Sequence, residues 1–169
     1  MIYVCENNKF GMGTSTKRSS ALDDYYKRGQ YMPGIKVDGM DVLNVRECTK
    51  YAIDHCRNGN GPFVLEMDTY RYHGHSMSDP GITYRSRDEI KRVRAARDPL
   101  EMQKKRIIDS GMATADEIKA LDKAIKVEVA EAAAAADADP MPPDHELWDN
   151  IYTVDKFARG VELGQSHVV

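Results

Sequence analysis

The side chains best suited to chemistry gather in one stretch, residues 70–87, which reads YRYHGHSMSDPGITYRSR. It holds two histidines, three arginines, three tyrosines, three serines, a threonine and an aspartate. Its few apolar residues follow neither helical nor strand spacing, and Pro80-Gly81 is typical of a turn. We therefore predict a polar loop. It follows directly on an apolar strand, and such loops often carry catalytic and binding groups.

His73 and His75 are the candidate catalytic pair of this loop. They lie two residues apart, so an extended backbone would place both on one side. Histidine titrates near neutral pH, and either residue could act as an acid, a base or a hydrogen-bond donor to a developing anion. The alternative is that one or both only brace the loop through backbone hydrogen bonds. Zinc is not expected, because no third ligand has suitable spacing.

The hydroxyl groups of Ser76, Ser78 and Thr83 are candidate phosphorylation sites. A phosphate there would add a charge of about −1.5 to −2 beside the histidines. The alternative is that these residues form turns by bonding to the backbone. The three arginines of the loop could bind phosphate or carboxylate groups, or could pair with nearby aspartates in solvent.

Asn7 and Asn8 follow a predicted strand at residues 2–5. The carboxyl ends of parallel strands form the usual ligand crevice of an open α/β sheet. Asparagine and backbone carbonyl oxygens are hard ligands that suit magnesium or calcium. The alternative is that both asparagines only form a turn. The adjacent Glu6 would point away from Asn7 by strand alternation.

The bulk composition suits one ordinary globular protein of 169 residues, long enough to bury a core. A net charge of −3 indicates neither nucleic acid nor a membrane surface as a partner. No apolar run approaches the roughly 18 residues of a membrane span. The first residues, MIYVCENN, do not resemble a signal or transit peptide. Three cysteines without CxxC spacing favour buried thiols in a reducing compartment.

The first half of the chain follows a strand–helix–strand pattern. Residues 2–5, 35–37 and 63–67 are short apolar runs, typical of buried parallel strands. Between the last two, Asp41 is a predicted helix N-cap. The helix is expected to end before the Asn58-Gly59-Asn60-Gly61-Pro62 sequence. Short connections of this kind predict a crossover in a parallel sheet, and hence an α/β fold.

The second half is predicted to be helical. Asp98-Pro99 places a cap residue before a proline at the first helical position. Thr114 and Glu117 have the spacing of a capping box. Apolar residues then form one stripe at Ile118, Leu121, Ile125 and Val129.

Several motifs together resemble the alpha subunit of the pyruvate dehydrogenase first component. They are ENN-x-FGMGTS at residues 6–15, YYKRG at 25–29, VDGMD at 37–41 and, above all, YRYHGHSMSDPG followed by Tyr84-Arg85. The resemblance runs from residue 2 to about residue 152, and it is closest to the mitochondrial type. The related branched-chain 2-oxo acid subunit carries a different loop without the HGHSMSDPG string.

This resemblance implies a thiamin diphosphate-dependent decarboxylase that acts on pyruvate. Asn8 and the backbone carbonyl of Phe10 match ligands of the magnesium ion on the cofactor. Arg71 and His73 match loop residues beside the diphosphate, and His75 matches the histidine that assists reductive acetylation of the lipoyl group. The expected phosphorylation sites are Ser76, Ser15 and Thr83.

The resemblance also implies partners, a location and a domain plan. The chain would form an α2β2 tetramer with a beta subunit, pass acetyl to a dihydrolipoyl acyltransferase, and be regulated by a kinase and a phosphatase in the mitochondrial matrix. Residues 1–87 would form part of the cofactor-binding α/β domain, including the loop at 70–87. Residues 88–152 would form a helical part, and 153–169 a loose tail.

One departure from the family pattern matters. The family motif begins with Gly-Asp-Gly upstream of the asparagine pair, and this chain contains no Gly-Asp-Gly. The chain therefore looks like the C-terminal half of the family's sequence, with part of the cofactor site missing. Two alternatives stay open: a non-catalytic regulatory or assembly module, and the alpha subunit of a branched-chain 2-oxo acid or acetoin dehydrogenase.

Overall fold

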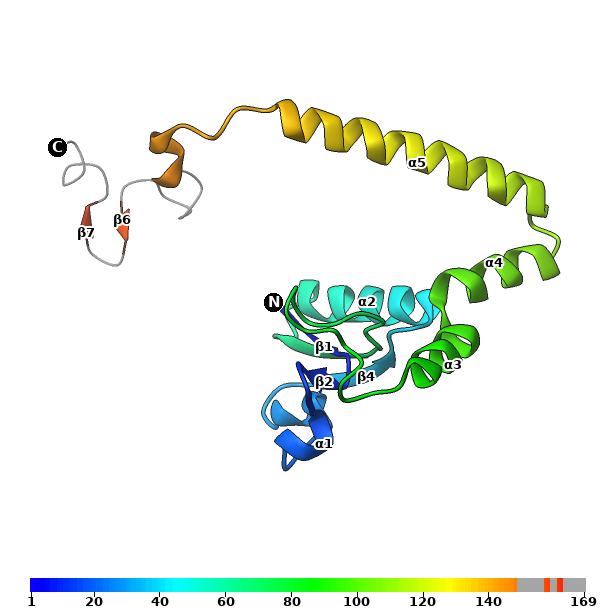
Figure 1. The fold of residues 1–169 in the computed structure, drawn as a ribbon. Helices are drawn as coiled ribbons and strands as arrows, with labels where there is room; N and C mark the ends of the chain where they lie inside the picture. Colours follow the sequence, from blue (N-terminus) through cyan, green and yellow to red (C-terminus); the bar gives the residue numbers. More distant parts are fainter. Residues whose placement is uncertain (149–156, 159–160, 163–169) are drawn as a thin grey trace. The chain divides into compact units, whose positions relative to one another are not determined.

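The computed structural model describes residues 1–148, 157–158 and 161–162 (Figure 1). The chain divides into two compact units, Met1–Ile118 and Lys119–Val169. Most of the predicted tail at 153–169 lies outside the described residues. Within it, β6 (Phe157–Ala158) and β7 (Val161–Glu162) pair antiparallel.

The first unit is built on a three-stranded parallel sheet with the order β1-β5-β4. The strands are β1 (Ile2–Asn7), β5 (Phe63–Asp68) and β4 (Gly34–Asp38). All three predicted strands are confirmed, and each extends one or two residues further than its apolar run. The predicted α/β class is also confirmed, because helices flank this parallel sheet (Figure 1).

Helix α2 (Val42–Arg57) connects β4 to β5 and packs against one face of the sheet. The predicted N-cap is confirmed, because the Asp41 carboxylate accepts hydrogen bonds from the backbone N–H groups of Leu43 and Asn44. Ala52 is fully buried where the helix meets the sheet. The core on this face consists of Val37, Ala52, Phe63 and Leu65, with partly buried apolar residues around them.

The opposite face of the sheet meets the 3₁₀ turn η1 (Tyr25–Arg28). The backbone approaches so closely at Gly34 that a Cβ atom there would lie 2.7 Å from the Tyr26 carbonyl oxygen. A side chain larger than hydrogen would therefore push η1 off β4. Between β1 and η1 lie the small hairpin of β2 (Phe10–Gly11) and β3 (Thr14–Ser15) and the short helix α1 (Thr16–Ser19).

Within the part of the chain that the structure describes, β1 pairs with β5 alone and is therefore an edge strand. Its side chains are poorly covered on both faces. Tyr3 is 48% exposed and Val4 is 64% exposed, although each lies in register with a buried β5 residue. The sheet therefore has one well-protected strand, β5, and one exposed strand, β1.

Three helices follow the sheet: α3 (Arg87–Arg97), α4 (Pro99–Asp109) and α5 (Ala115–Ala138). Asp98 caps α4 with Pro99 at its first position, as predicted. The predicted capping box is also confirmed, because Thr114 and Glu117 exchange side-chain-to-backbone hydrogen bonds. Among the described helices, none has both the length and the apolar character needed to cross a bilayer.

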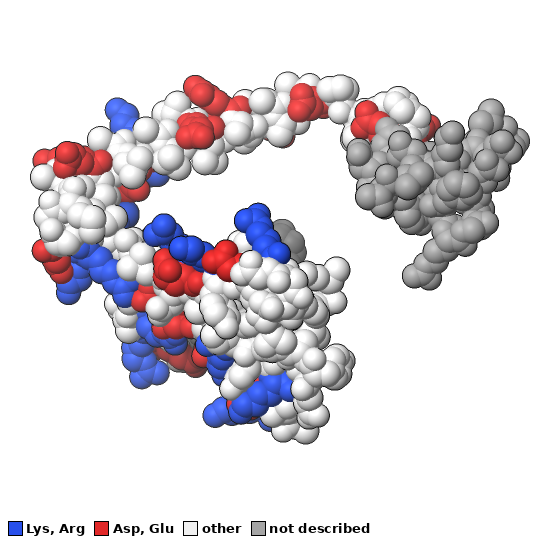
Figure 2. Space-filling model, turned by 180° about the vertical axis from the view of Figure 1, so that it is seen from behind, with Lys and Arg blue, Asp and Glu red and all other residues white. Residues whose placement is uncertain are grey.

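Figure 2 shows basic and acidic side chains mixed over one part of this face of the first unit, while the rest of the face is mostly uncharged. Two ion pairs fasten α3 and α4 to the sheet layer. Arg97 Nη2 lies 2.7 Å from the Asp38 carboxylate. Arg106 of α4 donates to both carboxylate oxygens of Asp41, over 2.9 and 2.6 Å. The hydrogen bonds from Arg106 and from the helix backbone hold the pKa of Asp41 well below its usual range.

The Asp41–Arg106 pair leads to a prediction about stability and pH. Because the folded-state pKa of Asp41 is lowered, its contribution is complete above about pH 3.9, the unfolded value, and is lost as the pH falls toward the folded value. The Asp41→Asn variant keeps a good N-cap but loses the ion pair. We expect this variant to have a lower urea midpoint of unfolding than the parent at pH 7, and a smaller difference from the parent at pH 2–3. Urea unfolding followed by circular dichroism measures both differences. Asp54→Asn, an exposed position on the same helix, is the control, and an equal effect in both variants would contradict the prediction.

Candidate functional site

Residues 70–86 between β5 and α3 form a loop without regular secondary structure, as predicted. We call this segment the histidine loop. Its organising side chain is Arg85, which is 5% exposed. The Arg85 guanidinium donates hydrogen bonds to the carbonyl oxygens of Gly81 (3.0 Å), His73 (2.7 Å) and Arg71. One buried cation therefore joins both ends of the loop.

Asp79 organises the centre of the histidine loop. Its carboxylate accepts hydrogen bonds from the backbone N–H groups of His75 (2.8 Å) and Gly81 (2.8 Å) and from the Tyr84 hydroxyl (2.9 Å). The two backbone donors, first that of His75, lower the pKa of Asp79. Close packing adds to this constraint: a Cβ atom on Gly74 would lie 1.8 Å from the Asp79 carbonyl oxygen. The turn that presents His75 is thus possible only with glycine at position 74.

The asparagine pair forms a tight turn at the carboxyl end of β1. The Asn7 side-chain oxygen accepts from the Lys9 N–H, and the Asn8 side-chain oxygen accepts from the Phe10 N–H, each over 3.2 Å. Lys9 adopts a positive φ of 73°, which is uncommon for a residue other than glycine. Its ammonium group lies 2.5 Å from the Asp68 carboxylate at the end of β5.

This turn and the histidine loop face one cavity of about 330 Å³. From the turn come Asn8 and Phe10, and from the loop come Arg71 and His75. The remaining lining residues come from β1, the turn, β2, α1 and η1: Cys5, Glu6, Asn7, Lys9, Gly11, Thr16, Ser19 and Tyr25. The cavity therefore combines amide and hydroxyl groups with the cationic side chains of Lys9 and Arg71 and the carboxylate of Glu6.

The Arg71–His75 contact decides which nitrogen of the imidazole can donate. Arg71 Nη1 lies 2.8 Å from His75 Nδ1. Because a guanidinium can only donate, Nδ1 must be the acceptor, and the neutral ring carries its hydrogen on Nε2. No hydrogen bond joins Nε2 to another residue of the described chain. In this arrangement His75 offers the cavity a hydrogen-bond donor.

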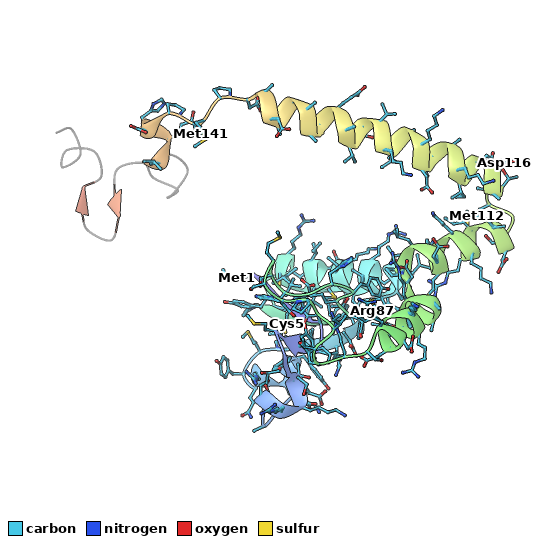
Figure 3. The ribbon with its side chains drawn as sticks, in the orientation of Figure 1. Met1, Cys5, Arg87, Met112, Asp116 and Met141 are labelled. Atoms are coloured by element: carbon cyan, nitrogen blue, oxygen red, sulfur yellow. The ribbon has the colours of Figure 1, made fainter. Side chains whose placement is uncertain are left out.

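Cys5, which is labelled on the ribbon in Figure 3, is one of the residues that line the cavity. Burial, and secondarily the nearby Glu66 carboxylate, raise the pKa of its thiol. Since the thiolate is the reactive form, Cys5 is a poor nucleophile here. All three cysteines are free thiols, as their number and spacing predicted, but the predicted burial is wrong, because each of them is only partly buried.

The comparisons with known proteins agree with this arrangement. Residues 1–145 match the family model described as "Dehydrogenase E1 component". The chain belongs to this family. The mitochondrial pyruvate dehydrogenase E1 component subunit alpha of Dictyostelium discoideum is 53% identical over 166 residues, which are 98% of this chain and 44% of that protein. The somatic mitochondrial forms of Rattus norvegicus and Homo sapiens are 53% and 52% identical over 154 residues, 91% of this chain and 40% of theirs. The chain thus spans less than half the length of these E1 relatives.

The structure brings together four of the predicted E1 site residues, since Asn8, Phe10, Arg71 and His75 all line the cavity. His73 is exposed outside the cavity lining, and its carbonyl accepts from Arg85. The predicted phosphorylation sites also lie outside the lining. Ser76 and Thr83 are exposed on the histidine loop, and Ser15 is half-buried in β3.

Reasoning from the sequence missed three residues that shape the site. The sequence treats Arg85 like the two other arginines of residues 70–87, and only its burial in the folded loop sets it apart. Glu66 was part of an apolar strand, although a carboxylate in such a run signals a buried polar contact. Tyr25 belonged to the YYKRG motif, but no local pattern indicated that it would reach the cavity.

The burial of Arg85 predicts that this residue sets the order of the histidine loop. The Arg85→Ala variant leaves three carbonyl groups without their charged donor. We expect it to lower the free energy of unfolding by about 1–3 kcal/mol and to speed cleavage within residues 70–86. Urea unfolding and limited proteolysis measure the two effects. Arg87→Ala, which removes an exposed arginine two residues later, should change neither, and equal proteolysis of both variants would refute the prediction.

Proposed function

We propose that this chain is the alpha-subunit part of a thiamin diphosphate-dependent pyruvate dehydrogenase. The observation that carries the proposal is the shared cavity of Asn8 and His75, which come from segments more than sixty residues apart. The names of the E1 alpha relatives support it. The reaction would decarboxylate pyruvate and transfer the acetyl group to the lipoyl group of a dihydrolipoyl acyltransferase.

The donor groups of the cavity fit magnesium thiamin diphosphate. The Asn8 side-chain oxygen and the Phe10 carbonyl are hard oxygen ligands suited to magnesium. Arg71 and Lys9 provide positive charge for a diphosphate. The described residues hold no cluster of three or more His, Cys, Asp or Glu side chains that could bind a metal instead.

The residues of this chain would bind the magnesium ion, orient the diphosphate and donate a hydrogen bond to the reacting group. Asn8 and Phe10 would hold the magnesium ion, and Arg71 would face the diphosphate. The resemblance also assigns His73 to the diphosphate, but His73 lies outside the cavity lining, so its side chain would have to turn inward to reach the cofactor. When bound, the thiazolium ring of the cofactor supplies the electron sink for decarboxylation. His75 would donate a hydrogen bond from Nε2 to the group that accepts the acetyl unit.

The relatives are named as alpha subunits and as mitochondrial, which supports a beta subunit partner and a mitochondrial location for this chain. The α2β2 tetramer and the mitochondrial matrix are proposed from the family resemblance. The chain carries no Gly-Asp-Gly sequence, so the cofactor would meet only part of its site here. We therefore expect the chain alone to bind magnesium thiamin diphosphate weakly, and tight stoichiometric binding in calorimetry would contradict that expectation.

The substrate assignment is tested on the chain assembled with a beta subunit. A preference of this assembly for branched-chain 2-oxo acids over pyruvate would overturn the assignment.

The role of Asn8 is tested by titrating the ¹⁵N-labelled chain with magnesium thiamin diphosphate at millimolar concentration. We expect chemical-shift changes at the Asn8 side-chain amide and at the backbone of residues 71–75, and none with thiamin lacking the diphosphate. In Asn8→Ala the affinity should fall at least about tenfold, because a metal ligand is lost. Asn60→Ala, in the exposed α2–β5 turn, is the matched control. Unchanged affinity in Asn8→Ala would exclude this site.

We propose that phosphorylation of Ser76 by a kinase, reversed by a phosphatase, disorders the histidine loop. The Ser76 side chain is exposed, and its carbonyl accepts from the Asp79 N–H at 3.0 Å. A negative charge there would repel the Asp79 carboxylate and the cofactor diphosphate. Ser15 and Thr83 are proposed as further phosphorylation sites because the family resemblance places such sites at these two positions.

Ser76→Glu should therefore increase proteolysis of residues 70–86, weaken the binding of magnesium thiamin diphosphate, and reduce acetyl transfer once the chain is assembled with a beta subunit. Ser76→Ala removes the hydroxyl without adding charge and should leave all three measurements close to those of the parent. Undiminished acetyl transfer in Ser76→Glu would count against the regulatory role.

A further inference from the structure

The buried carboxylate of Glu66 lies beneath the cavity without reaching it. Glu66 is fully buried in the central strand β5, and it is absent from the cavity lining. By the strand register it faces away from α2, toward η1 and the end of β1. A fully buried charged group is retained only where several partners satisfy it, so its contacts indicate what it holds in place.

The Glu66 carboxylate joins two segments that line the cavity. One oxygen accepts from the Asn7 side-chain amide over 2.7 Å, and the other accepts from the Tyr26 backbone N–H over 2.9 Å. Asn7, at the end of β1, lines the cavity, and so does Tyr25, which precedes Tyr26 in η1. The ammonium group of Lys36 on β4 lies 3.7 Å from the first oxygen. It also pairs with Asp24 over 3.1 Å, so the two carboxylates share one cation.

These hydrogen bonds also decide which way the Asn7 amide points. A carboxylate only accepts, so the NH₂ group of Asn7 must face Glu66. The Asn7 oxygen is then left to accept from the Lys9 N–H, which closes the turn containing Asn8. Reversing the amide would place its oxygen against the carboxylate and its NH₂ group against a backbone N–H. The direction of this one amide therefore determines how Asn8 is presented.

We propose that Glu66 is a positioning residue, which sets the turn carrying Asn8 by fixing the Asn7 amide and the η1 segment. The site it would serve is the proposed magnesium–diphosphate site, so the ligand-binding part of this inference rests on the proposed function. The local part concerns only Asn7 and Tyr26, and it stands without any ligand.

Glu66→Gln tests the local part. Glutamine has one oxygen and one NH₂ group, so it accepts well from only one of the two donors and presents a donor to the other. Hydrogen exchange of the Asn7 side-chain amide and of the Tyr26 backbone amide is expected to speed up in this variant. Val64→Ala is the matched control, since Val64 lies on the same face of β5 and has only apolar atoms to lose. Unchanged exchange in Glu66→Gln, or an equal increase in Val64→Ala, would overturn the proposal.

The ligand-binding part is tested by titration with magnesium thiamin diphosphate. We expect about 10- to 100-fold weaker binding in Glu66→Gln, the usual cost of losing a residue that orients a metal ligand, and parent-like binding in Val64→Ala. Asn7→Ala removes the same hydrogen bond from the other side, so it provides a second variant if Glu66→Gln does not fold. The double variant should lose no more affinity than either single variant. Additive losses would overturn the coupling between Glu66 and Asn7. If the parent binds no ligand while amide exchange still differs between Glu66→Gln and the parent, the proposed function is refuted and the local part of the inference stands.

Discussion

The pairing of β5 on both of its edges is the constraint on which the rest of the first unit depends. One face of β5 places Phe63 and Leu65 against α2, which gives the unit its core. The other face places Glu66 under the turn at the end of β1. Because the strands are parallel and in register, Asn7, Asp38 and Asp68 end at the same edge of the sheet. The histidine loop begins at that edge, so a single strand fixes where both halves of the cavity start.

The histidine loop keeps its shape by side-chain hydrogen bonds to backbone groups, since residues 70–86 form no helix or strand. Arg85 binds carbonyl oxygens, and Asp79 binds N–H groups. These two side chains therefore supply the hydrogen-bond partners that the backbone of a helix or a sheet would otherwise provide. Such a loop is ordered by a few charged residues. The same property would make the loop sensitive to the phosphate proposed at Ser76, because a new anion competes for the same backbone donors.

Much of the framework could be predicted from the sequence because it follows local rules. The three apolar runs, the Asp41 cap and the Thr114 capping box depend on residues close together in the chain, and all are found. The meeting of Asn8 with His75 needed two further facts, the rule that parallel strands end at one edge and the family resemblance of the loop. The role of Arg85 could not be separated from that of two neighbouring arginines, since burial depends on the whole loop. The role of Glu66 could not be predicted for the same reason, because its partners Asn7 and Tyr26 are 59 and 40 residues away in the sequence.

The exposed edge of β1 has a practical consequence. A parallel edge strand with Tyr3 and Val4 open to solvent presents backbone donors and acceptors together with apolar surface, and two such strands from different molecules can join their sheets. Self-association of this chain should therefore grow with protein concentration, and it should bury the β1 wall of the cavity as it proceeds. Ligand affinities measured on concentrated samples would then describe aggregates, so dilution series belong with every titration.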